Sequence, residues 1–397
     1  MATTSGHDRV ALVTALAMMA QAIAVLSCGP HPEQAPVTIA LSAGAGIFGA
    51  AFFLSWAAEA VQVDVPASLS FAFLAFVAVL PEYAVDLYFA WQAGQDPVYT
   101  QYAMANMTGA NRILIGIGWP LVLLAYAGRS RRSAIELSAG QRTELRFLLL
   151  ATLYCFIVPL KGSLGLIDSG VLILIFVAYL RAAAGGEHVE PELAGPAASV
   201  ARLPELKRRL AIAAMFAAAA LTIVWVAEPF AESLLAVGRG AGIDEFILIQ
   251  WVAPLASEAP EFIIAVLFAL QLKASAGFAT LLSSKVNQWT LLVGALPIAF
   301  AVSSGDWAPM ELDARQSSEI LLTGAQSLFG VVLLARMRFT RPAALTLAAL
   351  FIVQLSLPDP AIRAAFVWLY LGSALALVVV DGDRRRTLVS LVTGQTN

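Results

Sequence analysis

The segment Leu80-Pro81-Glu82-Tyr83 lies inside one apolar run of this chain, residues 71–91. The segment Ala259-Pro260-Glu261-Phe262 lies inside another, residues 246–272, and in both runs a Phe-Ala pair follows the proline by eight positions. A carboxylate in the hydrocarbon of a bilayer costs roughly 3 to more than 10 kcal/mol. Because the chain accepts this cost twice, each time beside a helix-breaking proline, the two segments predict a charged ligand near the middle of a membrane.

The composition is that of a membrane protein with many helical spans. Of 397 residues, 59% are hydrophobic and 13% are charged, and the mean hydropathy is +0.79. A helix needs about 20 apolar residues to cross a bilayer, and many stretches qualify. The apolar runs are continuous rather than alternating, which favours helices over a transmembrane barrel. We therefore expect an all-α polytopic membrane protein embedded in the lipid bilayer.

The rest of the composition limits the function. A net charge of -3 gives no indication of a nucleic-acid partner. Cys28 and Cys155 form no CxxC pattern and are interpreted as inert packing residues, and the three histidines are too scattered to predict a metal cluster. No P-loop and no Gly-x-Ser-x-Gly motif is present. The sequence therefore predicts neither an enzyme nor a bound cofactor.

The apolar runs predict about twelve spans. These are residues 10–28, 36–62, 67–92, 100–126, 143–160, 164–182, 208–237, 243–271, 275–302, 317–335, 342–357 and 360–381. With both termini in the cytoplasm, the basic connections at 129–146, 202–209, 336–341 and 384–386 all fall on the cytoplasmic side, and the acidic segment 303–316 falls on the other. This distribution follows the positive-inside rule and predicts a multi-pass protein of the cell membrane.

The two Pro-Glu segments then have opposite orientations in the membrane. Span 67–92 runs from inside to outside and span 243–271 from outside to inside, so similar sequences form an inverted repeat, an arrangement typical of secondary transporters. The expected organisation is an extra N-terminal helix and loop, a first repeat half, a flexible cytoplasmic linker, a second repeat half, and an extra C-terminal helix with a basic tail. These parts are residues 1–35, 36–182, 183–207, 208–357 and 358–397, respectively.

Glu82 and Glu261 are the central candidates for ligand binding. The proline before each glutamate has no N–H to donate, which frees the carbonyls of Val77 and Ala256 close to the two carboxylates. A carboxylate together with backbone oxygen is a typical environment for a hard cation. A proline kink with a neutralised carboxylate is the alternative, but two matched pairs in an inverted repeat favour a cation site.

Further acidic residues share these helices. Asp86 follows Glu82 by four residues and lies on the same helical face. Glu258 precedes Glu261 by three residues, and Ser257 adds a hydroxyl. These residues are candidate ligands of the same cation, although Asp86 could instead form a structural ion pair and Glu258 could face a water-filled vestibule.

Amide and basic side chains lie in the apolar segment that follows each Pro-Glu helix. Asn106, Asn111 and Asn287 are expected to supply neutral oxygens to the site, with ordinary interhelical packing as the alternative. Arg112 and Lys285 are predicted at membrane depth, far from the span ends, so pairing with carboxylates is expected. Because a buried lysine can lose its proton whereas arginine stays charged, Lys285 is either a built-in surrogate for a bound cation or a titrating group.

These motifs resemble those of the calcium/cation antiporter superfamily, which is best known from the sodium/calcium exchangers. Its two repeats carry a Gly-Thr-Ser-x-Pro-Glu helix and a partner helix with Gly-Asn-x-x-Gly-Ser-Asn. The matching residues are Pro81, Glu82, Pro260, Glu261, Asn106, Gly109, Asn111, Asn287 and Gly294. The resemblance covers residues 36–357 and implies a core of ten helices in a five-plus-five inverted repeat, with the first and last spans as additions.

The resemblance implies a secondary active antiporter that exchanges Ca²⁺ or Na⁺ against Na⁺ or H⁺ by alternating access. The chain departs from the family pattern where Val77-Ala78-Val79 replaces Gly-Thr-Ser and where Lys285 replaces a glycine. A fixed positive charge disfavours a divalent ion, so exchange of Na⁺ for H⁺ is one alternative. The other is a non-transporting scaffold or sensor in which Arg112–Asp86 and Lys285–Glu258 pairs close the site.

Overall fold

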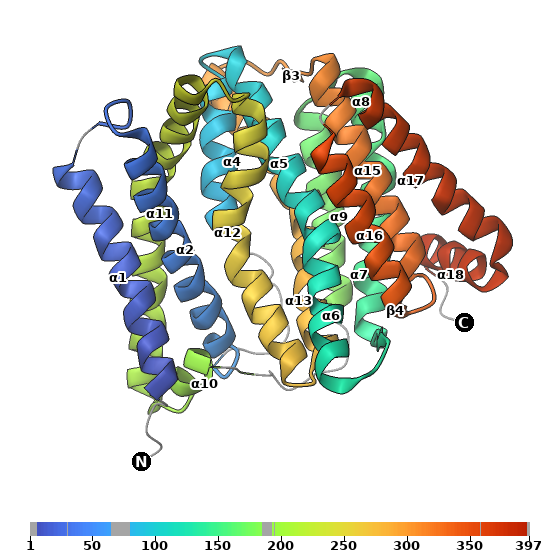
Figure 1. Ribbon diagram of the computed structural model, residues 1–397, viewed down its shortest axis with the longest axis horizontal. Coiled ribbons are helices and arrows are strands. Elements are labelled where there is room, and N and C mark those ends of the chain that lie inside the picture. The colour runs from blue at the N-terminus through green and yellow to red at the C-terminus, as the bar shows by residue number, and fades with distance from the viewer. Residues whose placement is uncertain are drawn as a thin grey trace. The chain divides into compact units, whose positions relative to one another are not determined.

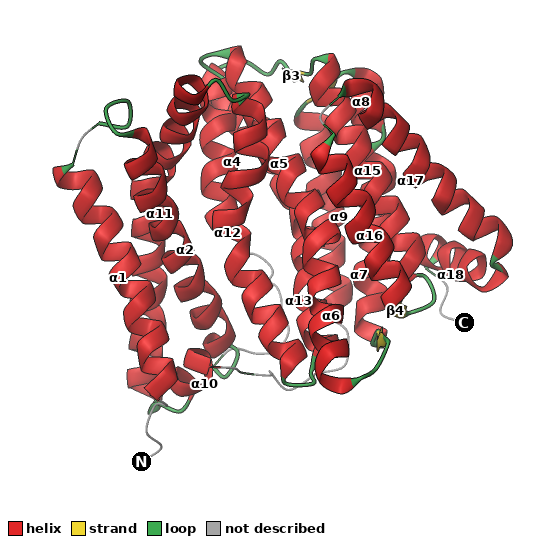
Figure 2. Ribbon diagram, in the orientation of Figure 1, coloured by secondary structure: helices red, strands yellow, loops and turns green. Residues whose placement is uncertain are grey.

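The chain is helical almost throughout the computed structural model, which describes residues 6–29, 31–64, 80–184, 193, 195–357 and 359–394 (Figure 2). The helices are α1 (Gly6–Cys28), α2 (Pro36–Val61), α4 (Leu80–Ala93), α5 (Thr100–Ile113), α6 (Trp119–Ser130), α7 (Ala139–Cys155), α8 (Ile157–Lys161), α9 (Leu166–Ala184), α10 (Gly195–Ala201), α11 (Glu205–Ala241), α12 (Glu245–Leu270), α13 (Ala274–Asn287), α14 (Val293–Ser304), α15 (Ala314–Leu334), α16 (Arg341–Ser356), α17 (Pro360–Val380) and α18 (Gly382–Thr393).

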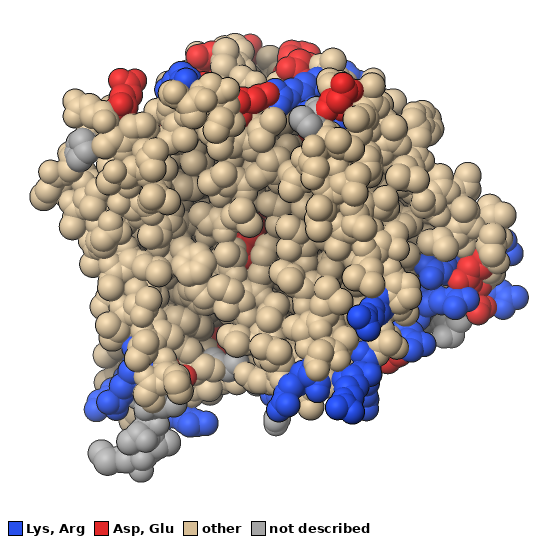
Figure 3. Space-filling view, in the orientation of Figure 1, with Lys and Arg blue, Asp and Glu red and all other residues tan. Residues whose placement is uncertain are grey.

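Ten helical segments in the described part of the chain are long and apolar enough to cross a membrane. They correspond to ten of the twelve predicted spans. The other two predicted spans correspond to α16, an apolar helix of 16 residues, and to α4. The predicted span 67–92 is described only from Leu80 onwards, because its residues 67–79 lie outside the described residues. The sides of the helices carry few charged groups in the space-filling view, as expected for surfaces that face lipid (Figure 3). The prediction of an all-α membrane protein is confirmed.

The helices form two compact units, and both halves of the chain contribute to each unit. The first unit comprises residues 1–89 and 184–261, and the second comprises residues 90–183 and 262–397. The boundaries fall inside α4 and α12, so each Pro-Glu helix takes part in both units.

In the first unit, α2 packs against both α1 and α11, and the three helices lie side by side (Figure 1). Small residues allow the close approach of α1 to α2: a Cβ atom built on Gly46 would lie 2.6 Å from the Cβ of Ala22, and one on Gly49 would lie 2.6 Å from the carbonyl oxygen of Ala15. Such small-residue contacts are typical of helix pairs in membranes, where close packing supplies much of the attraction. The N-terminal helix is therefore an integral part of this unit.

An ion pair joins the end of α2 to the beginning of α11 in the same unit. The Arg208 guanidinium donates to both carboxylate oxygens of Asp64, at 2.5 and 2.8 Å. These hydrogen bonds lower the pKa of Asp64 from its ordinary value, because they favour the ionised carboxylate. The pair therefore fixes where the chain enters the long helix α11.

In the second unit, α15 packs against α5, α7 and α17, while α16 packs against α6. Two short antiparallel sheets join segments that are far apart in the sequence: β1 (Ala134–Glu136) pairs with β4 (Arg338–Thr340), and β2 (Ser163–Leu164) pairs with β3 (Met310–Glu311). They satisfy backbone groups in the connections between helices, and the sequence analysis did not predict them.

Two π-helical turns interrupt the long apolar segments of this unit. One, Leu114–Gly118, joins α5 to α6, and the other, Gln288–Leu292, joins α13 to α14. The first is closely packed, because a Cβ atom built on Gly116 would lie 2.3 Å from the Cγ of Phe351 in α16. Only glycine fits this position without movement of a buried aromatic ring.

We expect Gly116→Ala to destabilise the protein. Overpacking of a well-packed interior costs about 1–3 kcal/mol, and the ring of Phe351 is fully buried, so the melting temperature in detergent should fall by several degrees. Gly128→Ala is the matched control, because no atom lies within 4 Å of a Cβ built on this helical glycine. Equal melting temperatures for the two variants would show that α16 does not press on the π-turn.

Candidate functional site

The carboxylates of the two Pro-Glu helices lie together in the first unit. The residues Glu82, Asp86, Glu258 and Glu261 are all buried, with at most 4% of their surface exposed. Glu258, Asp86 and Glu261 lie close enough to Glu82 for their charges to act on it. Four such groups in a medium of low polarity repel one another if all are ionised. Protons, bound cations or basic side chains must therefore balance the charge of this cluster.

The helix α12 continues through both of its internal prolines, Pro254 and Pro260. Neither proline has an N–H to donate to the preceding turn, so the carbonyls of Gln250 and Ala256 lose their ordinary helical donors. Ser257 lies between the two prolines in the sequence and is 6% exposed. Its hydroxyl makes long hydrogen bonds, of 3.4 and 3.5 Å, to carbonyl oxygens of its own helix. The corresponding carbonyl before Pro81, that of Val77, lies outside the described residues.

No group of three or more His, Cys, Asp and Glu side chains in the described part of the chain is arranged as a ready metal site.

The amide residues lie in the second unit, next to the π-turns. The side chain of Asn106 is buried, with 1% exposure, and neither its oxygen nor its nitrogen has a hydrogen-bond partner among the residues that the structure describes. Asn111 lies three residues before the first π-turn, and Asn287 lies directly before the second. Because buried polar groups are nearly always satisfied and π-turns frequently mark functional sites, these segments are candidate ligand-binding elements.

Lys285 of α13 binds Asn111 of α5. Its ammonium group donates to the side-chain oxygen of Asn111 at 2.5 Å and to the backbone oxygen of the same residue at 3.3 Å. It also lies 4.5 Å from the ring centre of Trp289, a cation–π contact. The lysine is fully buried, so its side-chain nitrogen occupies the amide oxygen of Asn111 that the sequence analysis assigned to a bound cation.

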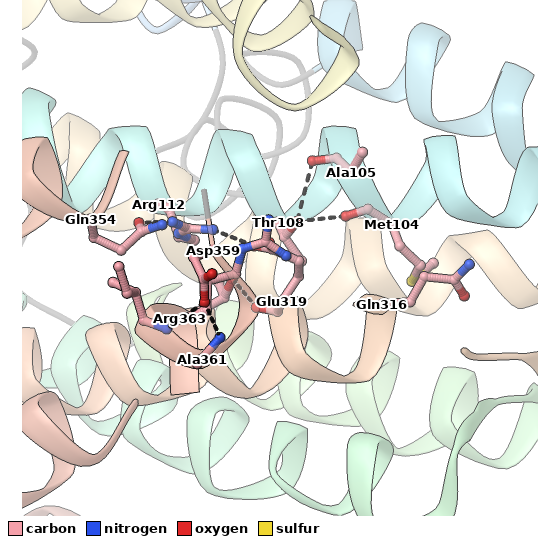
Figure 4. A network of polar contacts seen from close by, with 12 residues as sticks. Met104, Ala105, Thr108, Arg112, Gln316, Glu319, Gln354, Asp359, Ala361 and Arg363 are labelled. Carbon is pink, nitrogen blue, oxygen red and sulfur yellow. Dashed lines mark hydrogen bonds and ion pairs between the residues drawn. The ribbon is translucent and has the colours of Figure 1, made fainter. Parts of the chain in front are cut away.

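Arg112 belongs to a separate buried network (Figure 4). Its guanidinium donates to Glu319 of α15 and to Gln354 of α16. Glu319 also pairs with Arg363 of α17 at 3.1 Å. The sequence analysis considered Asp86 as the partner of Arg112 and did not single out the other three residues. Arg363 was detectable as a charged residue inside the predicted span 360–381, since such residues usually have a function.

The structure thus divides the predicted site residues between the two units. The acidic residues and Ser257 belong to the first unit, and the amides and basic residues belong to the second. Neither α4 nor α12 contains a basic residue, and neither α5 nor α13 contains an acidic one. The helices that follow the Pro-Glu helices are therefore opposite to them in charge.

Comparison with known proteins shows the family of the chain. The sequence pattern of the sodium/calcium exchanger protein family matches residues 35–184 and 211–358, one stretch in each half of the chain. The chain is similar to the crystal structure of the H⁺/Ca²⁺ exchanger CAX, with 40% sequence identity and a TM-score of 0.92 over 98% of this chain and 100% of that one. Comparison with curated protein sequences gives no match.

Two more distant structures share the fold. The Ca²⁺/H⁺ antiporter protein YfkE is 15% identical with a TM-score of 0.63, and the match covers 90% of this chain and 99% of that one. The sodium-calcium exchanger NCX_Mj is 14% identical with a TM-score of 0.52, over 87% and 99% of the two chains.

The repeated match of the family pattern and the likeness to these exchangers confirm the predicted inverted-repeat core, and with it an assignment to transporters rather than enzymes. The chain, with its paired Pro-Glu helices in a multi-pass membrane fold, belongs to the sodium/calcium exchanger family of cation exchangers.

Proposed function

We propose that this chain is a secondary antiporter that moves Ca²⁺ across the cell membrane in exchange for H⁺. The observation that carries the proposal is the cluster of four buried carboxyl groups on the two Pro-Glu helices. Such a cluster is neutral when it holds protons, and it becomes a strong site for a divalent cation when it releases them. Identity of 40% to a protein named as an H⁺/Ca²⁺ exchanger supports this choice of ions.

Glu82 and Glu261 are the proposed central ligands, and Asp86 and Glu258 are proposed to take up the released protons or to complete the ligand set. Ca²⁺ takes six to eight oxygen ligands, more than two carboxylates supply. The neutral oxygens are proposed to come from the buried side chains of Ser257, Asn106, Asn111 and Asn287. Alternating access would then expose this set of ligands to one side of the membrane at a time.

Lys285 is the proposed modulator of this exchange. While its ammonium group binds Asn111, the amide oxygen is not available to another cation. A lysine that leaves Asn111 when Ca²⁺ arrives would lower the affinity for Ca²⁺ and would favour its release. The same contact supports a second candidate function, exchange of Na⁺ for H⁺, since a fixed positive charge weakens binding of a divalent ion more than that of a monovalent one.

The proposed orientation has both termini in the cytoplasm. It places the basic connections of residues 129–146, 202–209 and 336–341 and the tail at 384–386 on the cytoplasmic side. In this arrangement residues 36–182 and 208–357 are the repeat halves, joined by the linker 183–207, and the flanking segments 1–35 and 358–397 are additions.

We expect Glu82→Gln and Glu261→Gln each to reduce proton-driven uptake of radioactive calcium by proteoliposomes at least about tenfold, since each removes a charged ligand from a buried site. Glu245→Gln is the matched control: Glu245 lies in the first turn of α12 and is partly exposed. Calcium uptake that persists in both Pro-Glu variants would contradict the proposed site.

The ions themselves require a separate comparison with the unmodified protein. Proteoliposomes should be tested with calcium and with sodium, each under proton and sodium gradients. Proton-coupled calcium flux supports the proposal, sodium–proton exchange without calcium flux supports the second candidate, and no flux of either ion supports the scaffold or sensor.

We expect Lys285→Met to lower the KM for calcium about 3- to 10-fold, because removal of an opposing charge interaction of about 1 kcal/mol changes binding by this factor. Methionine keeps the length of the side chain and removes the charge. Lys285→Arg, which keeps the charge, is the control and should not lower the KM. A higher KM in Lys285→Met would show that the lysine supports calcium binding instead of opposing it.

A further inference from the structure

The last long helix of the chain contributes to a network that reaches the proposed cation site. The family pattern ends at residue 358, and α17 begins at Pro360. By sequence, this helix is an addition to the exchanger core. Its fourth residue, Arg363, is nevertheless buried, with 7% exposure, and points into the second unit towards Glu319 (Figure 4).

Glu319 is shared between two arginines. Its Oε1 pairs with the Nε of Arg363 at 3.1 Å, and its Oε2 accepts from the guanidinium of Arg112. A second N–H group of Arg112 donates to the side-chain oxygen of Gln354. All four side chains are at least nine-tenths buried. The network therefore connects α5 with α15, α16 and α17 through directional contacts away from bulk water.

The backbone of α5 is held at the same position. The side-chain nitrogen of Gln326 in α15 donates to the carbonyl oxygen of Arg112 at 3.3 Å. Gly116 lies one turn after Arg112, in the π-turn, and Phe351 of α16 packs closely against it. Two helices, α15 and α16, thus contact this stretch of α5 through the side chain of Arg112, its backbone and the π-turn that follows it, and α17 reaches it through Glu319.

Asn111, the residue before Arg112, contacts a different helix. It binds Lys285 of α13 through its side-chain oxygen and its backbone oxygen. Consecutive residues of an α-helix point about 100° apart, so the rotation of α5 that places Arg112 among α15, α16 and α17 also determines the direction of Asn111. A change in the first contact therefore displaces the second.

Buried ion networks contribute more reliably to geometry than to stability. The desolvation of two arginines and one glutamate offsets much of their mutual attraction, whereas the planar guanidinium groups fix the direction of each contact. In metal sites, removal of a group that hydrogen-bonds to a metal ligand and orients it changes the affinity for the metal about 10- to 100-fold.

We propose that Arg363 of the C-terminal helix α17 is a positioning residue of the exchanger: through Glu319 it holds Arg112, and thereby sets the direction in which Asn111 presents its amide oxygen. This inference rests on the proposed function only in so far as Asn111 serves the transported cation. By this proposal, the helix α17 contributes to cation transport.

The test compares Arg363→Gln, Arg363→Lys and Arg384→Gln in the full chain. Arg384 is the matched control: it is a largely buried arginine that pairs with Asp381 at 2.8 Å and donates to the carbonyl of Val332 at 2.7 Å, at the other end of α17. Two quantities are measured, the KM for calcium in proteoliposomes and the hydrogen exchange of backbone amides in residues 106–118.

We expect Arg363→Gln to raise the KM about tenfold, with a smaller change in maximal rate, and to speed amide exchange in residues 106–118. Arg363→Lys should change the KM and the amide exchange less than Arg363→Gln does. Arg384→Gln should leave both quantities at the values of the unmodified protein. In a double-mutant cycle, Arg363→Gln should have little further effect on the KM once Asn111→Ala is present, because the two residues act through the same contact.

Three results would overturn the proposal. These are unchanged exchange of residues 106–118 in Arg363→Gln, faster exchange with an unchanged KM, and effects of Arg363→Gln and Asn111→Ala on the KM that are fully additive. Failure of the proposed function is distinguishable from these results, because it appears as an absence of calcium flux in the unmodified protein, while the exchange measurement still reports whether Arg363 holds α5.

Discussion

The carboxyl groups of Glu82, Asp86, Glu258 and Glu261 repel one another in a buried environment when they are ionised, and the proposed exchange depends on that repulsion. The groups lie on two helices that each contain a Pro-Glu pair, and at most 4% of each residue is exposed. Water does not screen charges at such positions, so protons, cations or basic side chains have to neutralise them. In the proposed exchange, protons and the transported cation would neutralise the cluster in turn.

The basic residues of the neighbouring segments add a second constraint. Lys285 occupies the oxygen atoms of Asn111, and Arg112 is held by Glu319 and Gln354. Although both cations lie within apolar segments, their surroundings differ. The lysine binds the oxygens of Asn111 and the ring of Trp289, whereas the arginine has Glu319 as a carboxylate partner.

Much of the architecture was predictable because membrane helices depend on local hydrophobicity. The predicted spans 36–62 and 360–381 agree closely with α2 (Pro36–Val61) and α17 (Pro360–Val380), since prolines and polar turns mark their ends. The π-turns were not predictable, because they share no composition: Leu114–Gly118 is apolar, whereas Gln288–Leu292 contains a glutamine and a threonine. The partners of Arg112 were not predictable either: Glu319 is 207 residues away, and Gln354 is 242 residues away.

The sequence by itself determined the class of protein and the inverted-repeat core, because both follow from apolar length, charge and the position of proline. Only the tertiary structure decided which polar groups meet. It brought Asp86, Glu258 and Glu261 to Glu82, gave Lys285 to Asn111, and joined Arg363 of the added C-terminal helix to Glu319 and Arg112. The reason is physical: hydrophobicity drives a segment into the membrane whatever its neighbours are, whereas a hydrogen bond or ion pair depends on how the helices pack.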